Sequence, residues 1–508
     1  MTVARTITAL VAVSVLTVAG CSSDGSDAGD DRGEPTTTAV GPETTEARQR
    51  PDGPAPTVEE ITGEGGVFLA AATASVDLDE AGYVEQEFAV AGTATSYEAD
   101  ELPGDGTYEL TEGDQADYKT RVVVRRPEDG AKANGAVVVE WLNVSGGLDA
   151  NPDYAFAAEE LVRGGYTWVG VSAQLIGVEG GPTAVALPGT ESLAGVGLKA
   201  FNADRYGDLS HPGDAYSYDI FTQVGRALRA DDGTLLGDVE MDRMLAVGES
   251  QSGFTLTTYA NGVQPLTEQF DGFLIHSRGG AAAPLRGSAD VIDIAGAIAG
   301  EPTIIRADLD VPVLILESES DVLSFLNFYP ARQPDTDRIR VWEVAGTAHA
   351  DAHLLGPVAG LAGCPTDINA GPHHFVVKAA LRSLDRWVAN DELPPSGDPL
   401  TVDPDAEGGP AYVRDADGIV EGGIRTPQVD VPVDVLSGDP AAGASIACML
   451  FGSTVPLPAA TLGDRYESAD DYLAQYEAAA DAVIEAGFVL PEDREALMAD
   501  ADPTRIDS

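Results

Sequence analysis

Short apolar runs alternate with stretches of helical periodicity from about residue 120 onward. Residues are apolar almost throughout 136–141, 167–172, 244–247, 273–275, 313–316 and 339–344. Between these runs, residues 153–163, 216–228 and 253–260 repeat apolar side chains at helical intervals. Strands that are apolar throughout are buried on both faces, and helices between them indicate parallel crossovers. The pattern predicts an α/β fold with a mostly parallel central sheet and helices on both faces.

Two segments fall outside this alternation. Residues 177–212 are rich in Gly and Pro and predict a lid-like insertion over the strand ends. Residues 365–508 predict a C-terminal extension, with one helix at 375–388 and another that begins after Ser468 and ends at Gly487. We therefore expect residues 60–508 to form one globular domain that carries both additions.

The first residues have the pattern of an export signal. Arg5 precedes an apolar run at 7–19, which is too short for a stable membrane-spanning helix. The ending Thr17-Val-Ala-Gly-Cys21 resembles a bacterial lipobox, which implies diacylation of Cys21. We expect residues 1–20 to be a signal peptide and residues 21–59 to be a polar tether. The chain would then be exported and lipid-anchored to the outer face of the cell membrane, unless this is an ordinary signal peptide with a chance cysteine.

Composition narrows the possible functions. The 508 residues include 29 Lys and Arg against 84 Asp and Glu, a formal charge of −55, which excludes a protein that mainly grips nucleic acid. Of the three cysteines, Cys364 and Cys448 remain after Cys21. In an exported protein such a pair is expected to oxidise, so we predict a Cys364–Cys448 disulfide, the alternative being two separate buried thiols.

The clearest chemical signal lies between a strand and a helix. Residues 245–247 are apolar, and Gly248-Glu-Ser250-Gln-Ser252 follows before helical spacing resumes. This resembles the nucleophile elbow of the α/β-hydrolase superfamily, in which a serine on a tight turn is flanked by small residues. The superfamily usually has Gly where this chain has Ser252. The alternative is that Ser250 or Ser252 only caps the helix.

An acid and a histidine follow in the order that this superfamily uses. The run at 313–316 leads into Glu317-Ser-Glu319-Ser-Asp321, and the run at 339–344 leads into Ala-Gly-Thr-Ala-His349. We expect Ser250 to be the nucleophile and His349 the base. Asp321 is the first choice for the acid that orients His349, and Glu319 is the second.

The oxyanion hole requires two backbone N–H groups. One is expected from Gln251, and the other from Asn143 or Val144 in the Gly-rich loop after the run at 136–141. Arg278 is a candidate for binding a substrate anion, or for a structural ion pair. His349-Ala-Asp351-Ala-His353 has ligand-like spacing, but the sequence offers no third ligand, so we expect no metal and no cofactor.

Three further segments suggest a narrower relationship. Residues 140–149, 205–214 and 422–427, together with the elbow, resemble a bacterial family described only as alpha/beta-hydrolase domain proteins, over roughly residues 68–500. The resemblance implies an esterase that acts on a small-molecule or lipid ester through an acyl-enzyme on Ser250. An acyltransferase with the same triad, or an inactive surface binding protein, is the alternative. The sequence does not indicate an oligomeric state.

Overall fold

The computed structural model describes residues 50–70, 76–185, 195–286, 291–292, 294–324, 326–440 and 444–506. The expected signal peptide, Cys21 and most of the expected tether lie outside these residues. Among the described residues, no helix is both long and apolar enough to cross a membrane.

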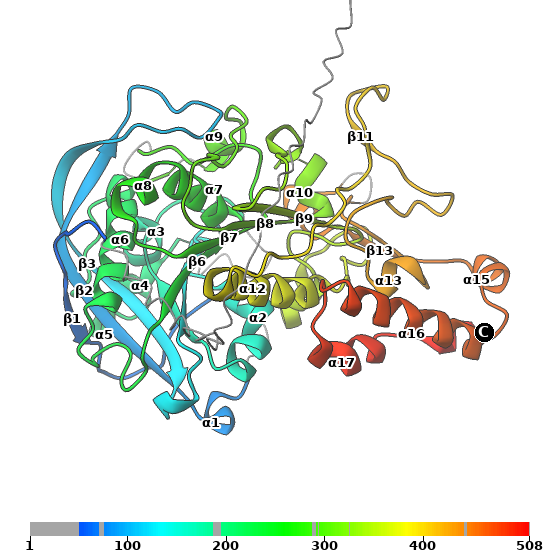
Figure 1. Cartoon of the computed structure of the whole chain (residues 1–508), viewed down its shortest axis with the longest axis horizontal. Coiled ribbons are helices and arrows are strands. Elements are labelled where there is room, and N and C mark those ends of the chain that lie inside the picture. Colours follow the sequence, from blue (N-terminus) through cyan, green and yellow to red (C-terminus); the bar gives the residue numbers. More distant parts are fainter. Residues whose placement is uncertain are drawn as a thin grey trace, which may run out of the picture. The chain divides into compact units, whose positions relative to one another are not determined.

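One nine-stranded sheet organises the chain (Figure 1). Its order is β1-β2-β3-β5-β4-β6-β7-β8-β9, and pairing is antiparallel from β1 to β5 and parallel from β5 to β9. The strands are β1 Thr57–Glu60, β2 Tyr83–Glu98, β3 Thr111–Pro127, β4 Ala136–Trp141, β5 Thr167–Val171, β6 Arg243–Glu249, β7 Gly272–His276, β8 Val313–Ser318 and β9 Ile339–Val344. The six predicted apolar runs are the parallel strands, so the predicted mostly parallel α/β fold is confirmed.

Alternate residues of the strands face two separate hydrophobic layers. Val138, Leu245 and Leu274 pack under helices α2 (Pro152–Arg163) and α12 (His373–Asn390). Their neighbours, such as Val139 and Ala246, pack under α6 (Ser217–Arg229) and α7 (Gln251–Thr258) on the other face. Both faces of each parallel strand are therefore buried, as continuous apolar runs require.

The expected tether ends earlier than the sequence suggested. β1 occupies Thr57–Glu60 and pairs with β2, so residues 57–59 belong to the sheet. The strand lies at the sheet edge and three of its four side chains are exposed. A strand held mainly by backbone hydrogen bonds leaves no apolar pattern in the sequence, which explains the error.

Three short helices lie within or at the edge of the described part of the expected lid-like insertion, 177–212. These are α3 (Leu175–Glu179), α4 (Gly197–Phe201) and α5 (Ala203–Tyr206). Val178, Leu198 and Tyr206 of these helices pack against Ala89 of β2. Residues 186–194, in the middle of the insertion, lie outside the described residues.

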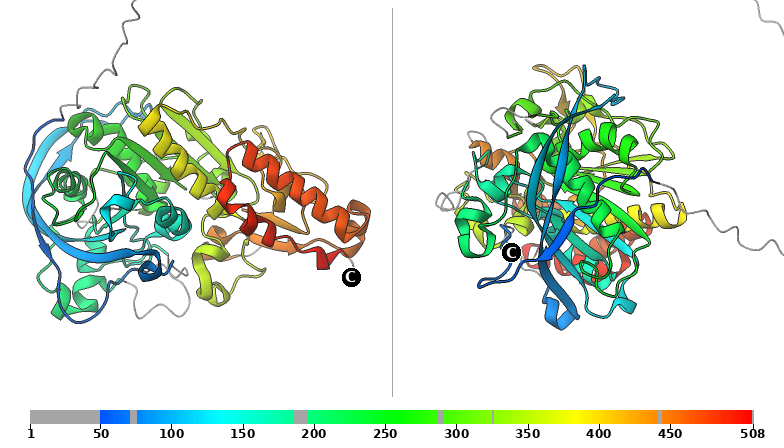
Figure 2. Two further views of the ribbon diagram at one scale, coloured as in Figure 1. Left: turned by 60° about the horizontal axis from the view of Figure 1, so that its bottom comes forward. Right: turned by 90° about the vertical axis from the view of Figure 1, so that its left-hand side faces the viewer.

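The expected C-terminal extension divides into two parts. Helix α12 covers the parallel sheet directly, so it belongs to the central layers and not to an added segment. The rest forms the end of the molecule away from the β1–β3 ribbon (Figure 2). It comprises β10 (Val402–Asp403), β11 (Ala411–Tyr412), α13 (Pro427–Asp430), β12 (Asp434–Ser437), α14 (Ile446–Phe451), β13 (Ser453–Pro456), α15 (Ala459–Arg465), α16 (Ala469–Glu485) and α17 (Arg494–Ala499). The predicted Cys364–Cys448 disulfide is present and ties α14 to the segment before α12.

Candidate active site

Ser250 occupies a strained turn at the carboxyl end of β6. Its backbone has φ 59° and ψ −121°, and α7 begins at the next residue. A β-carbon added to Gly248 would come within 3.0 Å of the Ser252 Cβ, so the turn requires glycine at that position. Ser252 is fully buried and fits where related elbows carry glycine. The turn is anchored to β7 because the Ser250 N–H donates to the His276 carbonyl at 3.0 Å.

Ser250, His349 and Asp321 form a continuous hydrogen-bonded chain. The Ser250 Oγ lies 2.7 Å from His349 Nε2, and His349 Nδ1 lies 2.7 Å from Asp321 Oδ1. The second oxygen of Asp321 accepts hydrogen bonds from Ser318 and Ser277. Burial alone would raise the pKa of Asp321, but His349 and these donors outweigh it and hold the pKa below its ordinary value. A carboxylate that stays ionised beside Nδ1 can orient the imidazole and stabilise its protonated form.

Glu319, the second choice for the acid, holds the backbone of the histidine loop. Its Oε2 accepts from the Gly346 N–H at 2.8 Å, three residues before His349. Its Oε1 accepts from the Ser437 hydroxyl at 3.0 Å and from Arg414 at 2.8 Å. Of the two acids that the sequence left open, the structure therefore places Asp321 at the imidazole and Glu319 behind the loop, where it joins the C-terminal region to it.

Glu249, which the sequence analysis did not select, also touches the histidine. Its Oε1 lies 3.2 Å from His349 Nε2, the atom that faces Ser250. Burial raises the pKa of Glu249 to about 8. For His349, burial lowers the pKa, but Glu249 and then Asp321 outweigh it and raise the pKa to about 9. Glu249 occupies a position of the elbow motif that admits any residue type. The only sequence signal for a role of Glu249 is that it directly precedes Ser250.

The expected oxyanion donors are only partly available. Gln251 is the first residue of α7, so its backbone N–H has no acceptor within the helix. The Asn143 N–H, however, donates to the Ala150 carbonyl at 2.9 Å, and the Val144 N–H donates to Gln251 Oε1 at 3.1 Å. Neither of these two N–H groups is therefore without an acceptor in this conformation. The Asn143 N–H is hydrogen-bonded within its own loop, to Ala150, and the Val144 N–H is hydrogen-bonded to the Gln251 side chain.

Two buried side chains at and after the end of β7 have their partners within the fold. Arg278 is fully buried and donates to Thr257 Oγ1 and to the Thr303 carbonyl, so it has a structural role and does not bind a substrate anion. His276 is buried between Asp153 and His373, with a ring nitrogen 2.9 Å and 2.8 Å from each. No group of three or more His, Cys, Asp or Glu in the described part of the chain is arranged to hold a metal ion.

A cavity of about 410 Å³ opens beside Ser250 and His349. Its lining is mainly apolar and comes from the segment before α1 (Leu78–Ala81), the loop after β4, the elbow, Val185 of the expected insertion, and the region of α11 (Ala352–Leu355) and α14. The lining residues are Phe68, Leu69, Ala70, Asn143, Ser145, Gly146, Leu148, Ala150, Pro152, Val185, Glu249, Ser250, His349, Ala350, Leu354, Leu355, Val358, Leu450 and Phe451.

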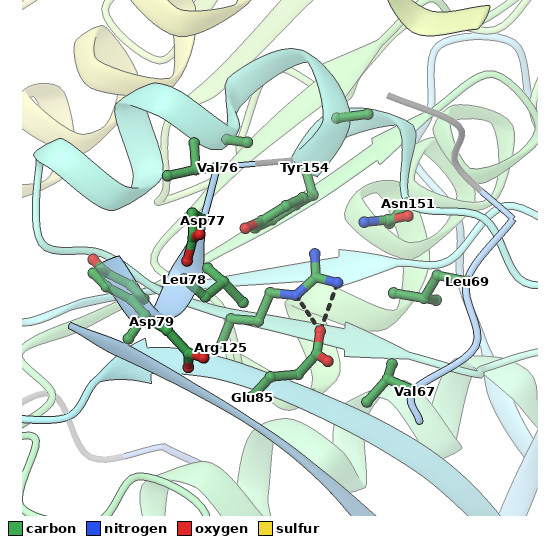
Figure 3. Close-up of a pocket in the computed structure, with 13 residues that line it drawn as sticks. Val67, Leu69, Val76, Asp77, Leu78, Asp79, Glu85, Arg125, Asn151 and Tyr154 are labelled. Carbon is green, nitrogen blue, oxygen red and sulfur yellow. Dashed lines mark hydrogen bonds and ion pairs between the residues drawn. The ribbon is translucent and has the colours of Figure 1, made fainter. Parts of the chain in front are cut away.

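A second cavity of about 550 Å³ contains none of these catalytic candidates (Figure 3). It lies between α2 and strands β2 and β3, where Arg125 pairs with Glu85 at 2.7 Å. The Arg125 guanidinium also lies 4.1 Å from the centre of the Tyr154 ring. Arg125 is thus committed to partners within the fold.

Comparison with known proteins gives a family match over most of the chain. A family model described as "Alpha/beta hydrolase domain" matches residues 50–499. Similar solved structures include a putative dienelactone hydrolase from Klebsiella pneumoniae (13% identity, 59% of this chain and 99% of that chain, TM-score 0.29) and XC6422, an α/β serine hydrolase from Xanthomonas campestris (13%, 58% and 94%, TM-score 0.29). A fungal esterase from Rhizomucor miehei is also similar (12%, 59% and 85%, TM-score 0.31). No curated protein matches the sequence.

Proposed function

The chain belongs to the alpha/beta hydrolase domain family, and from that premise we propose that it is a serine hydrolase that cleaves carboxylic esters through an acyl-enzyme on Ser250. The observation that carries the proposal is the unbroken chain of hydrogen bonds from Ser250 through His349 to Asp321. The strained backbone at Ser250 and the adjoining cavity support the same assignment.

The reaction takes place in two halves. Ser250 Oγ attacks the ester carbonyl carbon while its proton moves to His349 Nε2, and Asp321 stabilises the resulting imidazolium. The tetrahedral intermediate expels the alcohol, which leaves with the proton from Nε2. Water then attacks the acyl-enzyme and gives a proton to Nε2. The second tetrahedral intermediate expels Ser250 Oγ, which takes that proton back from Nε2, and the carboxylic acid is released.

The Gln251 backbone N–H is the first donor for the developing oxyanion. The Val144 N–H becomes a second donor if the Gln251 side chain turns away from it, since that side chain is its present acceptor. Two donors aimed at the oxyanion stabilise the transition state more than the ground state, which is what acceleration requires.

Labelling with an alkyl fluorophosphonate tests the proposal. We expect the wild-type protein to be labelled and to hydrolyse p-nitrophenyl butyrate. Ser250→Ala is expected to lose both properties, whereas Ser252→Ala, which removes a buried hydroxyl two residues away, is expected to keep both. A folded wild-type protein without labelling or turnover would instead indicate a binding protein. Acylated alcohol in excess of free acid, with an added alcohol acceptor, would indicate acyl transfer.

We also propose that the protein is exported and anchored through a lipid on Cys21. The support is the sequence of residues 5–21 alone. Metabolic labelling with radioactive palmitate in a bacterial host tests it. We expect the wild-type protein to carry label in the membrane fraction and Cys21→Ser to carry none, and unlabelled wild-type protein would contradict the proposal.

A further inference from the structure

We infer that the substrate is a small ester with an apolar acyl or alcohol group and no negative charge. The inference rests on the proposed function and concerns the cavity beside Ser250. The cavity volume of about 410 Å³ is in the range of small-molecule sites, so we expect the part of the substrate bound there to be the size of a small molecule.

The cavity walls have few groups with which a polar substrate could pair. The apolar surface comes from residues such as Phe68, Leu148, Leu354, Leu450 and Phe451. Besides the nucleophile Ser250, the lining has polar uncharged side chains at Asn143 and Ser145. Asn143 already donates to Glu249, and Ser145 donates to Asn143, so these polar side chains mainly serve one another.

The charges at the cavity exclude an anionic group. Glu249 and His349 are the titratable residues among the described lining residues, and no lysine or arginine is among them. In the form that reacts, His349 is uncharged, so a substrate carboxylate or phosphate would lose its hydration here with no lysine or arginine to pair with, and Glu249 would repel it when ionised. The formal charge of −55 for the whole chain acts in the same direction at low ionic strength.

A series of p-nitrophenyl esters tests the apolar part of this inference. Burying one methylene is worth up to about fourfold in binding, so kcat/KM is expected to rise from acetate to hexanoate by roughly tenfold or more. A matching series of acetate esters with lengthening alcohols tests whether the alcohol is the apolar group. No increase in either series would overturn the inference, while fluorophosphonate labelling of Ser250 would leave the proposed function standing.

A matched pair of substrates tests the charge. The p-nitrophenyl monoester of glutaric acid ends in a carboxylate where p-nitrophenyl pentanoate ends in a methyl group. We expect at least a 100-fold lower kcat/KM for the glutarate ester. Val358→Lys, at a half-buried lining position, is expected to reduce this preference by roughly tenfold because it supplies a cation. Equal rates for the two esters would contradict the inference.

A separate contact carries a second inference, that Glu249 is a second carboxylate acting on the catalytic imidazole. Its Oε1 is 3.2 Å from His349 Nε2, while Asp321 lies at Nδ1 on the opposite side of the ring. When Nε2 takes the proton of Ser250, the imidazolium therefore gains an acid partner at each nitrogen. Asn143 supports this placement, because its Nδ2 donates to the Glu249 carbonyl at 3.1 Å.

The other charged groups around this pair come from neighbouring elements. Asp153 of α2 and Asp321 raise the pKa of Glu249 further, and His349 lowers it. His276 of β7 and His373 of α12 also lie near His349, but burial holds the pKa of both well below the ordinary value, so they remain uncharged at neutral pH. The ionised form of Glu249 thus favours the protonated histidine, which cannot act as a base.

The dependence of kcat/KM on pH, with an uncharged ester, tests this role. We expect the wild-type acid limb to have a midpoint above pH 7, because Glu249 makes His349 harder to deprotonate. Glu249→Gln is expected to lower that midpoint by about one unit, a tenfold change in proton affinity, and to lower the alkaline plateau by roughly tenfold. A purely structural role would reduce the plateau without moving the midpoint, and that result would overturn the inference.

Glu317→Gln is the matched control. Glu317 is an equally buried glutamate at the end of β8, and no hydrogen bond joins it to His349 among the described contacts. The acid limb of the pH profile of Glu317→Gln is expected to have the same midpoint as that of the wild type. If Glu249→Gln does not fold, Glu249→Asp serves as the second variant, and it should move the midpoint in the same direction by a smaller amount. An unchanged midpoint in that variant would contradict the inference.

Discussion

Buried charges at the antiparallel end of the sheet are paired with one another. Arg121 lies on β3 and is fully buried, with Glu87 Oε1 at 3.2 Å and Asp149 Oδ2 at 2.7 Å. Glu87 also accepts from Arg205 at 2.7 Å and from the Tyr206 hydroxyl at 2.9 Å. We call these five residues the Arg121 cluster. Arg121 also donates to the carbonyl of Phe68, a residue of the cavity wall.

Four buried acids at the carboxyl edge of the parallel strands have no such pairing. They are Glu140, Asp153, Glu249 and Glu317, and we call them the edge acids. In the described part of the chain none of them forms an ion pair with a lysine or arginine. Burial raises the pKa of Asp153 and of Glu249 to about 8, and it raises the pKa of Glu140 and Glu317 as well.

The comparison between the Arg121 cluster and the edge acids distinguishes buried charges that stabilise the fold from buried acids that exchange protons. A buried charge with partners on several elements holds those elements in register, and removing one partner leaves the others uncompensated. A buried acid without a cation avoids that cost by keeping its proton, which raises its pKa. One acid of this second kind, Glu249, contacts His349, and a hydrolase needs groups that exchange protons at that place.

The largest expected effect comes from the acid that remains ionised. Asp321→Asn should lower kcat/KM by roughly 10³- to 10⁴-fold, because the amide no longer fixes the imidazole tautomer or stabilises the imidazolium. Glu319→Gln should lower kcat/KM by only about tenfold. Glu319 contacts the backbone of the histidine loop, and the glutamine amide oxygen still accepts the Gly346 N–H.

Steady-state kinetics with p-nitrophenyl butyrate measures both variants, and circular dichroism confirms that they fold. A greater loss in Glu319→Gln than in Asp321→Asn would reverse the assignment of the acid.

The second expected effect concerns stability. Glu87→Gln should lower the free energy of unfolding by roughly 3 kcal/mol, because Arg121 and Arg205 then remain buried without their shared carboxylate. Glu98→Gln is the control. Glu98 pairs with Arg286 at the surface, where an ion pair contributes about 1 kcal/mol or less. Urea unfolding of the three proteins provides the comparison, and equal losses would show that the Arg121 cluster does not stabilise the fold.

Much of this architecture could be predicted from the sequence. Parallel strands buried on both faces are apolar throughout, so periodicity alone located them. The elbow was visible because steric crowding at Gly248 and Ser252 admits only small residues. The order of serine, acid and histidine is the one that the resemblance to the α/β-hydrolase superfamily implies.

The remaining features depend on where side chains point. Glu319 and Asp321 are two residues apart on one short helical turn, and only the structure shows that one faces the imidazole and the other faces Gly346. Glu249 stands at a motif position that admits any residue type. The Val144 N–H is occupied by a side chain from another element, which no local pattern encodes.

The smallest expected effect is on stability. It comes from Glu317→Gln among the edge acids, the same type of substitution as Glu87→Gln in the Arg121 cluster. Glu317, like Glu87, is fully or almost fully buried, but neither of its carboxyl oxygens has a hydrogen-bond partner among the described residues. Its pKa in the folded protein is raised above the ordinary value of a glutamate. The folded state therefore keeps a proton that the unfolded state loses above about pH 4.3, so this group lowers stability as the pH rises.

Glu317→Gln removes that titration. We expect its free energy of unfolding to equal that of the wild type near pH 4 and to exceed it by roughly 1 kcal/mol at pH 8, because the amide has no proton to lose as the pH rises. Urea unfolding at the two pH values measures the difference. Glu87→Gln, with the same change of one oxygen to an amide nitrogen, is destabilising at pH 8. If both substitutions destabilised the protein equally at pH 8, the edge acids would be structural charges of the same kind as the Arg121 cluster.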